Sequence, residues 1–365
     1  MFDRRVLSHF DWWLFAYVIA IMVIGAVNLN SASMASGVHY QWKQLEWYGI
    51  GLVLMFLFTI FDYRILASYV LHIYIITIFS LLLVMFIGKS ISGSQRWIPL
   101  GFFHLQPSEL AKLSTVIVIS SYFYNHEKAH YGIKDLIRPA ALMIVPFFLI
   151  FRQPDLGTAL LVLLIMASII IVAGLRWTSV ISIIMACVGI MPLVWKFLKP
   201  YQKKRLETFL NPEMDPLGSG YHVIQSKIAV GSGQILGKGY MAGTQAHLDF
   251  LPEAHTDFAF SIWAEEWGFI GASILLAIYL LIILRGIEIA CQSKERFGSF
   301  LAFGVVAMLF WQVVINTCMV TGLMPVVGIP LPMISYGGSS VITTMIGIGL
   351  LLNIKARRFI FESRK

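Results

Sequence analysis

The sequence has few charged residues and few cysteines. Only 13% of its 365 residues are Asp, Glu, Lys or Arg, whereas 58% are hydrophobic and the mean hydropathy is +0.79. Soluble domains carry about 25% charged residues, so a single water-soluble core is excluded. We expect an all-α polytopic membrane protein, because helices satisfy their own backbone groups in lipid.

The three cysteines, Cys187, Cys291 and Cys318, have no spacing typical of a metal site. They are interpreted as small apolar residues of the membrane segments. The first residues, "MFDRRVLSHFDWWLF", lack a small-residue cleavage site and predict an uncleaved first span.

Ten apolar segments predict about ten transmembrane helices, each of roughly 20 residues. They lie near 12–31, 45–61, 67–88, 108–124, 139–151, 156–173, 178–198, 259–284, 298–322 and 338–354. The fifth is short and contains Pro146. We expect one membrane domain over residues 1–365, with residues 199–257 forming a large extracytoplasmic loop between spans 7 and 8.

Lysine and arginine predict the orientation. With a cytoplasmic N-terminus, fifteen of them fall in inner segments and four in the short outer loops. The positive-inside rule therefore puts both termini on the cytoplasmic side of the membrane. The net charge of +8 reflects mainly the lysines and arginines of the inner segments, which also attract anionic lipid. It does not indicate nucleic-acid binding.

Two charged residues interrupt the fourth segment, within "QRWIPLGFFHLQPSELAKL" (95–113). Pro107 and Ser108 are typical of a helix start, so Glu109 and Lys112 share one helical face. A charged pair in a membrane segment indicates function by default, and a purely structural ion pair is the alternative. Arg96, in the preceding loop, has a guanidinium suited to a phosphate.

The long loop carries a second group of charges. Lys203, Lys204 and Arg205 form a basic cluster, Lys227 follows, and Lys238 lies in the glycine-rich run "GSGQILGKG". The spacing does not match a nucleotide-binding loop. The cluster fits either contact with lipid headgroups or binding of an anionic substrate at the membrane surface.

Acidic residues and histidine gather where this loop meets the eighth span, in "DFLPEAHTDFAF" (249–260). Asp249, Glu253, His255 and Asp257 occur within nine residues. Pro252 argues against a site in which protein side chains alone bind a metal. A divalent cation, Mg²⁺ or Mn²⁺, shared with a substrate diphosphate fits better. Earlier in the chain, Asp155 of "FRQPDLGT" is a predicted helix cap.

The last outer loop, "GLMPVVGIPLPMISYGGSS" (322–340), has too many prolines and glycines to continue a span. Irregular backbone at membrane depth is tolerated only inside protein or beside a cavity. We expect this loop to re-enter the protein and line a cleft. Ser335 within it is taken as a substrate-binding candidate.

These stretches, in this order, resemble the SEDS family (shape, elongation, division and sporulation) of membrane glycosyltransferases. The resemblance is carried by "QRWIPLG…QPSELAKL", "QPDLGT", "DPLGSGYHVIQSKIAVGSG", "FLPEAHTDFAF" and "GIPLPMISYGGSS". It covers nearly the whole chain. His222, Lys227 and Gln245 resemble the elongation member rather than the division member.

The resemblance implies polymerisation of lipid II into peptidoglycan during cell elongation, with a class B penicillin-binding protein and other elongation-complex proteins as partners. It also implies that Asp257 is the catalytic aspartate. A base is what an inverting transfer needs. Arg96, Glu109, Lys112, Lys204, Arg205, Lys227 and Ser335 are then substrate-binding candidates. A lipid II flippase and a scaffold without chemistry remain the alternative functions.

Overall fold

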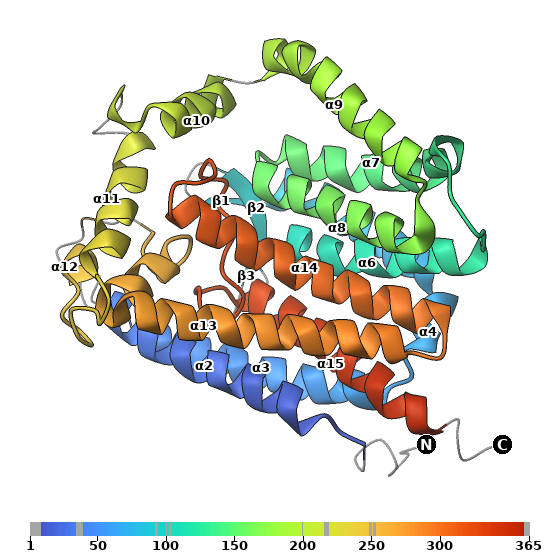
Figure 1. Ribbon diagram of the computed structural model, residues 1–365, viewed down its shortest axis with the longest axis horizontal. Coiled ribbons are helices and arrows are strands. Elements are labelled where there is room, and N and C mark those ends of the chain that lie inside the picture. The colour runs from blue at the N-terminus through green and yellow to red at the C-terminus, as the bar shows by residue number, and fades with distance from the viewer. Residues whose placement is uncertain are drawn as a thin grey trace.

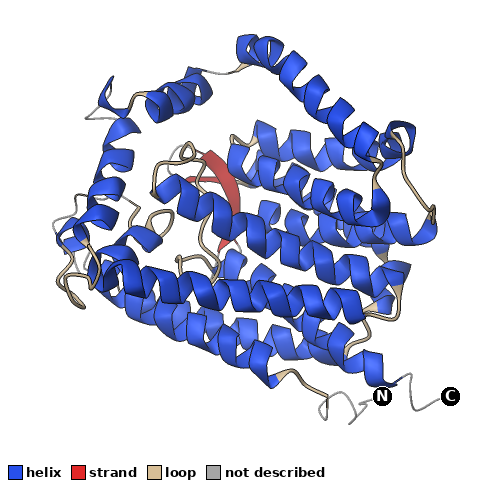
Figure 2. Cartoon of the chain, viewed as in Figure 1, coloured by secondary structure: helices blue, strands red, loops and turns tan. Residues whose placement is uncertain are grey.

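Helices make up most of the computed structural model, which describes residues 9–33, 39–91, 94–99, 101, 104–198, 200–214, 219–247, 250 and 253–360 (Figures 1 and 2). The long helices are α2 (Trp12–Ala32), α3 (Tyr40–Ile60), α5 (Val70–Ile87), α6 (Pro107–Asn125), α7 (Ile137–Arg152), α8 (Leu156–Gly174), α9 (Trp177–Phe197), α13 (Ala259–Gln292), α14 (Arg296–Val320) and α15 (Gly338–Ile360). Shorter ones are α4 (Arg64–Ser68), the 3-10 helix η1 (Ile133–Leu136), α10 (Pro200–Leu210), the 3-10 helix η2 (Pro212–Met214), α11 (Ser219–Ser232) and α12 (Thr244–His247).

A long helix stands at each of the ten predicted positions. Six of them, α2, α5, α8, α13, α14 and α15, have the length and apolar composition to cross a membrane. The predicted helix start at Pro107 is confirmed, and so is the cap at Asp155, which accepts a hydrogen bond from the Thr158 amide. The polytopic all-α membrane fold is therefore confirmed, while the count of ten spans stays a prediction.

The centre of the bundle is formed by α14, which packs against α13, α8 and α6. On one side of it, α15 packs along α3, and α2 lies beside α13. Both chain ends lie at one end of the bundle, and α10 to α12 lie at the other (Figure 1). The structure thus has two distinct ends, which we call the terminal end and the loop end.

A small sheet at the loop end is not predicted by the sequence. Strands β1 (Lys89–Ile91), β2 (Ser94–Pro99) and β3 (His104–Leu105) pair antiparallel in that order. They connect α5 to α6, and β2 packs against both of these helices. The sheet places Arg96 on its central strand.

Residues 322–337 fold back into the protein, as predicted. Ile329, Leu331 and Met333 are fully buried. Side chains of neighbouring helices satisfy the irregular backbone: Gln44 Nε2 donates to the Ser335 carbonyl at 3.2 Å, and the Tyr48 hydroxyl donates to that of Met333. This loop is therefore a packed wall at the loop end of the bundle.

Candidate functional site

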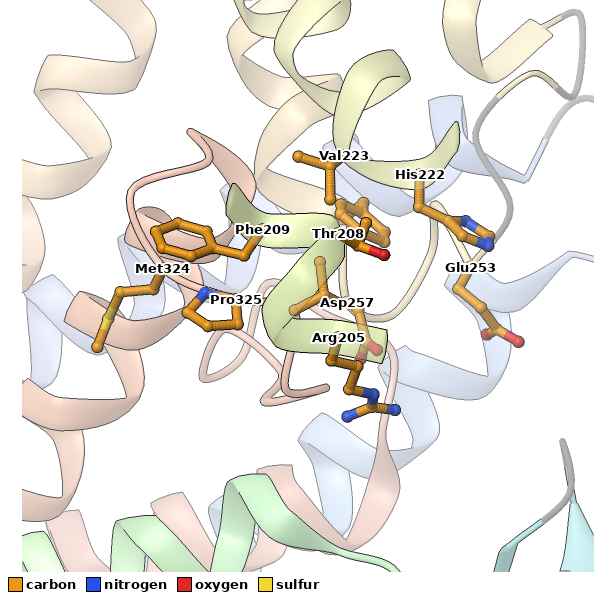
Figure 3. Close-up of a pocket in the computed structure, with 11 residues that line it drawn as sticks. Arg205, Thr208, Phe209, His222, Val223, Glu253, Asp257, Met324 and Pro325 are labelled. Carbon is orange, nitrogen blue, oxygen red and sulfur yellow. The ribbon is translucent and has the colours of Figure 1, made fainter. Parts of the chain in front are cut away.

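A pocket of about 270 Å³ opens at the loop end of the bundle (Figure 3). Four segments far apart in sequence line it: α10, α11, the turn before α13 and the loop after α14. The lining residues are Arg205, Thr208, Phe209, His222, Val223, Glu253, Asp257, Phe258, Met324, Pro325 and Val326. The pocket thus brings together the predicted base, one predicted cation and the predicted re-entrant loop.

Backbone contacts fix the position of Asp257 in this pocket. Its carbonyl accepts a hydrogen bond from Asn316 Nδ2 at 2.9 Å, and the same amide donates to the Ile329 carbonyl at 2.8 Å. The fully buried Asn316, near the end of α14, therefore joins the turn before α13 to the re-entrant loop. Gly328, with φ of +74°, leaves room for the carboxylate, since a Cβ there would lie 3.3 Å from Asp257 Oδ2.

Burial dominates the pKa of the Asp257 carboxyl. The pKa of this carboxyl is raised from 3.8 to about 6, mainly by burial and next by the Glu253 carboxylate. Arg96 and Arg205 lower the pKa, but burial outweighs them. A carboxyl with a pKa near 6 is mostly ionised at neutral pH, so Asp257 is available there as a carboxylate.

Arg96 is held at the edge of the site by the loop before α8. Its Nε donates to the Gln153 carbonyl at 3.3 Å, its Nη2 donates to the Pro154 carbonyl, and Nη1 lies 3.7 Å from Asp155 Oδ1. Asp155 also accepts from Ser108 Oγ at 3.2 Å, besides capping α8. Arg96 therefore has a fixed position within electrostatic reach of Asp257.

The other predicted cations lie on the helices that form the outer wall. Lys204 is exposed beside Arg205 on α10. Lys227 is exposed on α11, and its side chain lies against Gly322 at the start of the re-entrant loop. Of these three cations, only Arg205 contributes to the pocket lining.

The three other predicted binding residues, Glu109, Lys112 and Ser335, are buried and do not line the pocket either. Glu109 and Lys112 form an ion pair of 2.6 Å inside α6, with side chains only 2% and 1% exposed. Ser335 is buried, and its hydroxyl accepts from the Leu331 amide at 2.8 Å. Substrate contact by these residues stays a prediction; in the structure Glu109 and Lys112 pair with each other, and Ser335 binds the backbone of the re-entrant loop.

Histidines and aromatic residues add features that the motifs did not reveal. His222 lines the pocket, and burial lowers its pKa, so its imidazole is neutral at physiological pH. His255 stacks on Tyr40 with ring centroids 4.2 Å apart, and its carbonyl accepts from the Tyr336 amide at 2.8 Å. This stack ties the turn before α13 to α3 and to the re-entrant loop.

The glycine-rich run around Lys238 packs against α13. Lys238 Nζ lies 2.6 Å from the fully buried carboxylate of Glu265, which also accepts from the Thr244 amide at 2.9 Å. A Cβ at Gly233 would lie 2.0 Å from the Ala264 carbonyl oxygen. The glycines therefore allow close packing of this segment on α13, and Lys238 is an anchor rather than part of a phosphate cradle.

No group of three or more His, Cys, Asp or Glu side chains with the geometry of a metal site occurs in the described ranges. The side chains of His247 and Asp249 lie outside the described residues. Glu253 and Asp257 both belong to the turn that precedes α13. A cation bound partly by substrate remains compatible with the two pocket carboxylates.

Comparison with known proteins gives a consistent result. The chain is 39% identical to the peptidoglycan glycosyltransferase MrdB of Escherichia coli K12, over 96% of this chain and 94% of that protein. It is 32% identical to the peptidoglycan glycosyltransferase RodA of Treponema pallidum, over 97% of this chain and 99% of the relative.

Solved structures agree. A chain from a study of how a peptidoglycan synthase complex coordinates polymerization and crosslinking superposes with a TM-score of 0.83 and 35% identity, covering 96% of this chain and 98% of that one. The rod shape determining protein RodA of Thermus thermophilus gives a TM-score of 0.72 and 31% identity, with the same coverage. Residues 8–359 match the family described as cell cycle proteins, and the chain therefore belongs to the FtsW/RodA/SpoVE family.

Proposed function

We propose that this protein polymerises lipid II on the outer face of the bacterial cytoplasmic membrane, with Asp257 as the general base of an inverting transfer. It matches peptidoglycan glycosyltransferases over nearly their whole length, and this chain is a peptidoglycan glycosyltransferase as well. The substrate, the stereochemistry and the roles of residues are the parts proposed here.

One observation carries the proposal: Asp257 is a fixed carboxylate in a pocket that also contains a guanidinium. The donor sugar of lipid II is α-linked to diphosphate, and the linkage in the polymer is β, so a single displacement suffices. Asp257 takes the proton from the 4-hydroxyl of the acceptor as that oxygen attacks the donor carbon. The bond to the diphosphate breaks, and the diphosphate leaves as an anion.

The cations around the pocket suit the leaving group. Arg205 lines the pocket, and Arg96 acts electrostatically on Asp257. Lys204 is the neighbour of Arg205 on α10, and Lys227 lies against Gly322 of the re-entrant loop. Fixed positive charge stabilises negative charge that develops in the transition state, so no second carboxyl group is required as an acid. Each of these residues is therefore proposed to hold the diphosphate of donor or acceptor.

A divalent cation, Mg²⁺ or Mn²⁺, is compatible with this arrangement. Magnesium is commonly bound by one or two carboxylates together with substrate phosphates. Glu253 and Asp257 line the same pocket and offer such carboxylates. The cation would supply further neutralisation of the diphosphate when bound.

The topology and partners follow the same proposal. Ten spans, cytoplasmic termini and an outer segment 199–257 would put the pocket where lipid II is exposed. A class B penicillin-binding protein would cross-link the strands as they emerge. The relative studied for coordination of polymerization and crosslinking supports such a pairing.

The test is the variant Asp257→Asn in purified protein supplied with labelled lipid II. Asparagine keeps the shape of the side chain and caps a helix well, but it cannot act as a base. We expect strand synthesis to fall about a hundredfold or more, with melting temperature and membrane insertion unchanged. The matched control is Glu207→Gln, an exposed carboxylate on α10 that is outside the pocket lining.

Long glycan strands made by Asp257→Asn at near the wild-type rate would refute the assignment of the base. Lipid II transfer across the bilayer by wild-type protein, with no polymer formed, would instead identify a flippase. Neither polymer nor transfer under any partner condition would indicate a scaffold.

A further inference from the structure

A second pocket lies at the terminal end of the bundle, far from Asp257. Its volume is about 290 Å³, and it is formed where α6 ends and α7 begins. The lining residues are Tyr122, His126, Lys128, Tyr131, Lys134, Asp135 and Arg138. The proposed glycosyl transfer uses none of these residues.

Tyr131 makes the floor of this pocket rigid. Its side chain is almost fully buried, and its hydroxyl donates to the His126 carbonyl at 2.6 Å and accepts from the Lys128 amide at 3.2 Å. Its backbone amide donates to the Gly174 carbonyl at 3.1 Å, and its carbonyl accepts from the Arg176 amide at 3.0 Å. The pocket is therefore a preformed feature locked between α6 and the end of α8.

Positive charge is in excess in this pocket. Asp135, the one carboxylate of the lining, lies 2.5 Å from Lys128 Nζ and also accepts from the Gly132 amide at 2.8 Å. These hydrogen bonds, with Arg176 nearby, hold the pKa of Asp135 below its ordinary value, so it stays ionised and occupied by these partners.

Glu127, on the same loop, pairs with Arg296 of α14 instead of a lining cation. Within the described residues, this leaves Lys134 and Arg138 exposed and paired with no carboxylate. Two free cations at the mouth of a preformed pocket indicate an anionic ligand.

The surroundings of the pocket are those of a membrane surface. Ile133 and Ile137 flank Lys134 and Arg138 in sequence and are exposed, and Trp177, next to Arg176, is 78% exposed. Tryptophan at a helix end typically marks the level of the headgroups. Apolar side chains beside free cations suit a molecule with a charged head and acyl chains.

We propose that the pocket of Lys134 and Arg138 binds the phosphate of an anionic phospholipid headgroup, whose acyl chains lie along Ile133, Ile137 and Trp177. Basic pockets between transmembrane helices on the cytoplasmic side are known to suit such headgroups. A free phosphate would meet the same charges but would gain nothing from the exposed apolar side chains.

The experiment uses full-length protein in nanodiscs of equal parts phosphatidylglycerol and phosphatidylcholine, with the lipids retained after release counted by native mass spectrometry. We expect wild-type protein to retain phosphatidylglycerol preferentially. Lys134→Gln with Arg138→Gln should weaken that preference about tenfold or more, because each basic residue near a membrane contributes separately. Both positions are exposed, so the melting temperature should not change.

The matched control is Lys294→Gln, which removes an exposed cation outside the pocket lining at the same end of the bundle. It should retain phosphatidylglycerol like the wild type. Equal retention by the double variant and the wild type would overturn the proposal. Displacement of the lipid by millimolar inorganic phosphate would show a free-anion site instead, and equal retention of phosphatidylcholine would exclude selection by charge.

Discussion

Asp257 combines two properties that work against each other in a base. Burial makes its carboxylate more basic, with a pKa near 6, while the neighbouring guanidinium groups keep it ionised at neutral pH. A base is most effective when its pKa lies close to the working pH. The raised pKa has a cost: the stabilising contribution of the protonated group is complete below pH 3.8 and is lost as the pH rises through about 6.

The pH dependence of activity should reveal this carboxyl. We expect kcat/KM for lipid II to fall as the pH drops below about 6, since the protonated acid cannot accept the hydroxyl proton. Glu253→Gln removes a charge that raises the pKa, so the midpoint should move to lower pH. Arg205→Gln removes a charge that lowers it, so the midpoint should move to higher pH. The measurement is initial polymerisation rate against pH at limiting substrate.

Glu207→Gln serves again as the control and should leave the midpoint in place. A midpoint near 4 for the wild-type enzyme would show that burial does not govern this group. If the midpoints for Glu253→Gln and Arg205→Gln move in the same direction, the charges of Glu253 and Arg205 do not set the pKa of Asp257 as described.

The ion pair of α6 shows what a residue pattern predicts and what it leaves open. The spacing of Glu109 and Lys112 predicted a contact on one helical face, and the structure confirms it. Depth is not encoded in spacing, because it depends on the packing of α8 and α14 against α6. Removing one partner of such a buried pair lowers the stability of the fold by about 3–5 kcal/mol. Variants of Glu109 or Lys112 can therefore lose activity because α6 is destabilised.

Among the elements, α13 follows directly on the turn that holds Asp257, the proposed base. It is interrupted at Gly268, where φ is +63° and ψ is −162°. Its first part, 259–267, is bound to the glycine-rich segment through Glu265 and Lys238, and the amide of Phe269 donates to the Gln234 carbonyl at 2.8 Å. The position of Asp257 thus depends on how the outer segment sits on this half-helix.

Gly268→Ala tests that dependence. A Cβ at this position would lie 2.3 Å from the Gly237 amide nitrogen, and the backbone conformation is open to glycine alone. We expect a loss of about 1–3 kcal/mol of stability and a slower polymerisation rate. Thermal unfolding in detergent and strand synthesis measure the two effects.

The control for this substitution is Gly189→Ala in α9. No atom lies within 4 Å of the Cβ position there, and alanine in a helix interior gains roughly 0.5–1 kcal/mol over glycine. Gly189→Ala should therefore be neutral or stabilising. If Gly268→Ala behaves like Gly189→Ala in both assays, the interruption of α13 has no bearing on the site.

Helices were predictable because lipid requires long apolar runs, and Pro107 and Asp155 mark helix starts by local chemistry alone. The sheet of β1 to β3 was not predictable, because its strands are two to six residues long and show little alternation of apolar and polar residues. The role of Lys238 was also missed: its partner Glu265 is 27 residues away and inside an apolar segment. Local pattern cannot indicate which buried carboxylate a lysine will reach.

For the molecule as a whole, the pocket is assembled from residues as far apart as Arg205 and Val326. The motifs singled out Asp257, Arg205 and the re-entrant loop, and the structure brings them into one pocket, while their role in substrate binding stays a prediction. They did not predict Thr208, Phe209 or Val223, because side chains of these types are common on any amphipathic helix. The raised pKa of Asp257 was likewise inaccessible, since burial arises only from the folded arrangement.

The orientation of the bundle in the membrane is the remaining prediction at this scale. The charge distribution puts the loop end outside and the terminal end in the cytoplasm. Leu236, 79% exposed in the glycine-rich segment, and His130, exposed between α6 and α7, lie at opposite ends. The test starts from a chain in which Cys187, Cys291 and Cys318 are replaced by serine. Leu236 and His130 are then changed to cysteine, one in each variant.

A maleimide that cannot cross membranes is then added to intact spheroplasts. We expect Leu236→Cys to be labelled at once and His130→Cys only after the membrane is permeabilised, because the reagent reaches the outer face alone. The cysteine-free chain provides the background, and polymerisation by each variant shows that it has folded. Rapid labelling of His130→Cys in intact spheroplasts, with Leu236→Cys protected, would invert the topology. It would also place Asp257 on the cytoplasmic side, where lipid II polymerisation on the outer face could not use it.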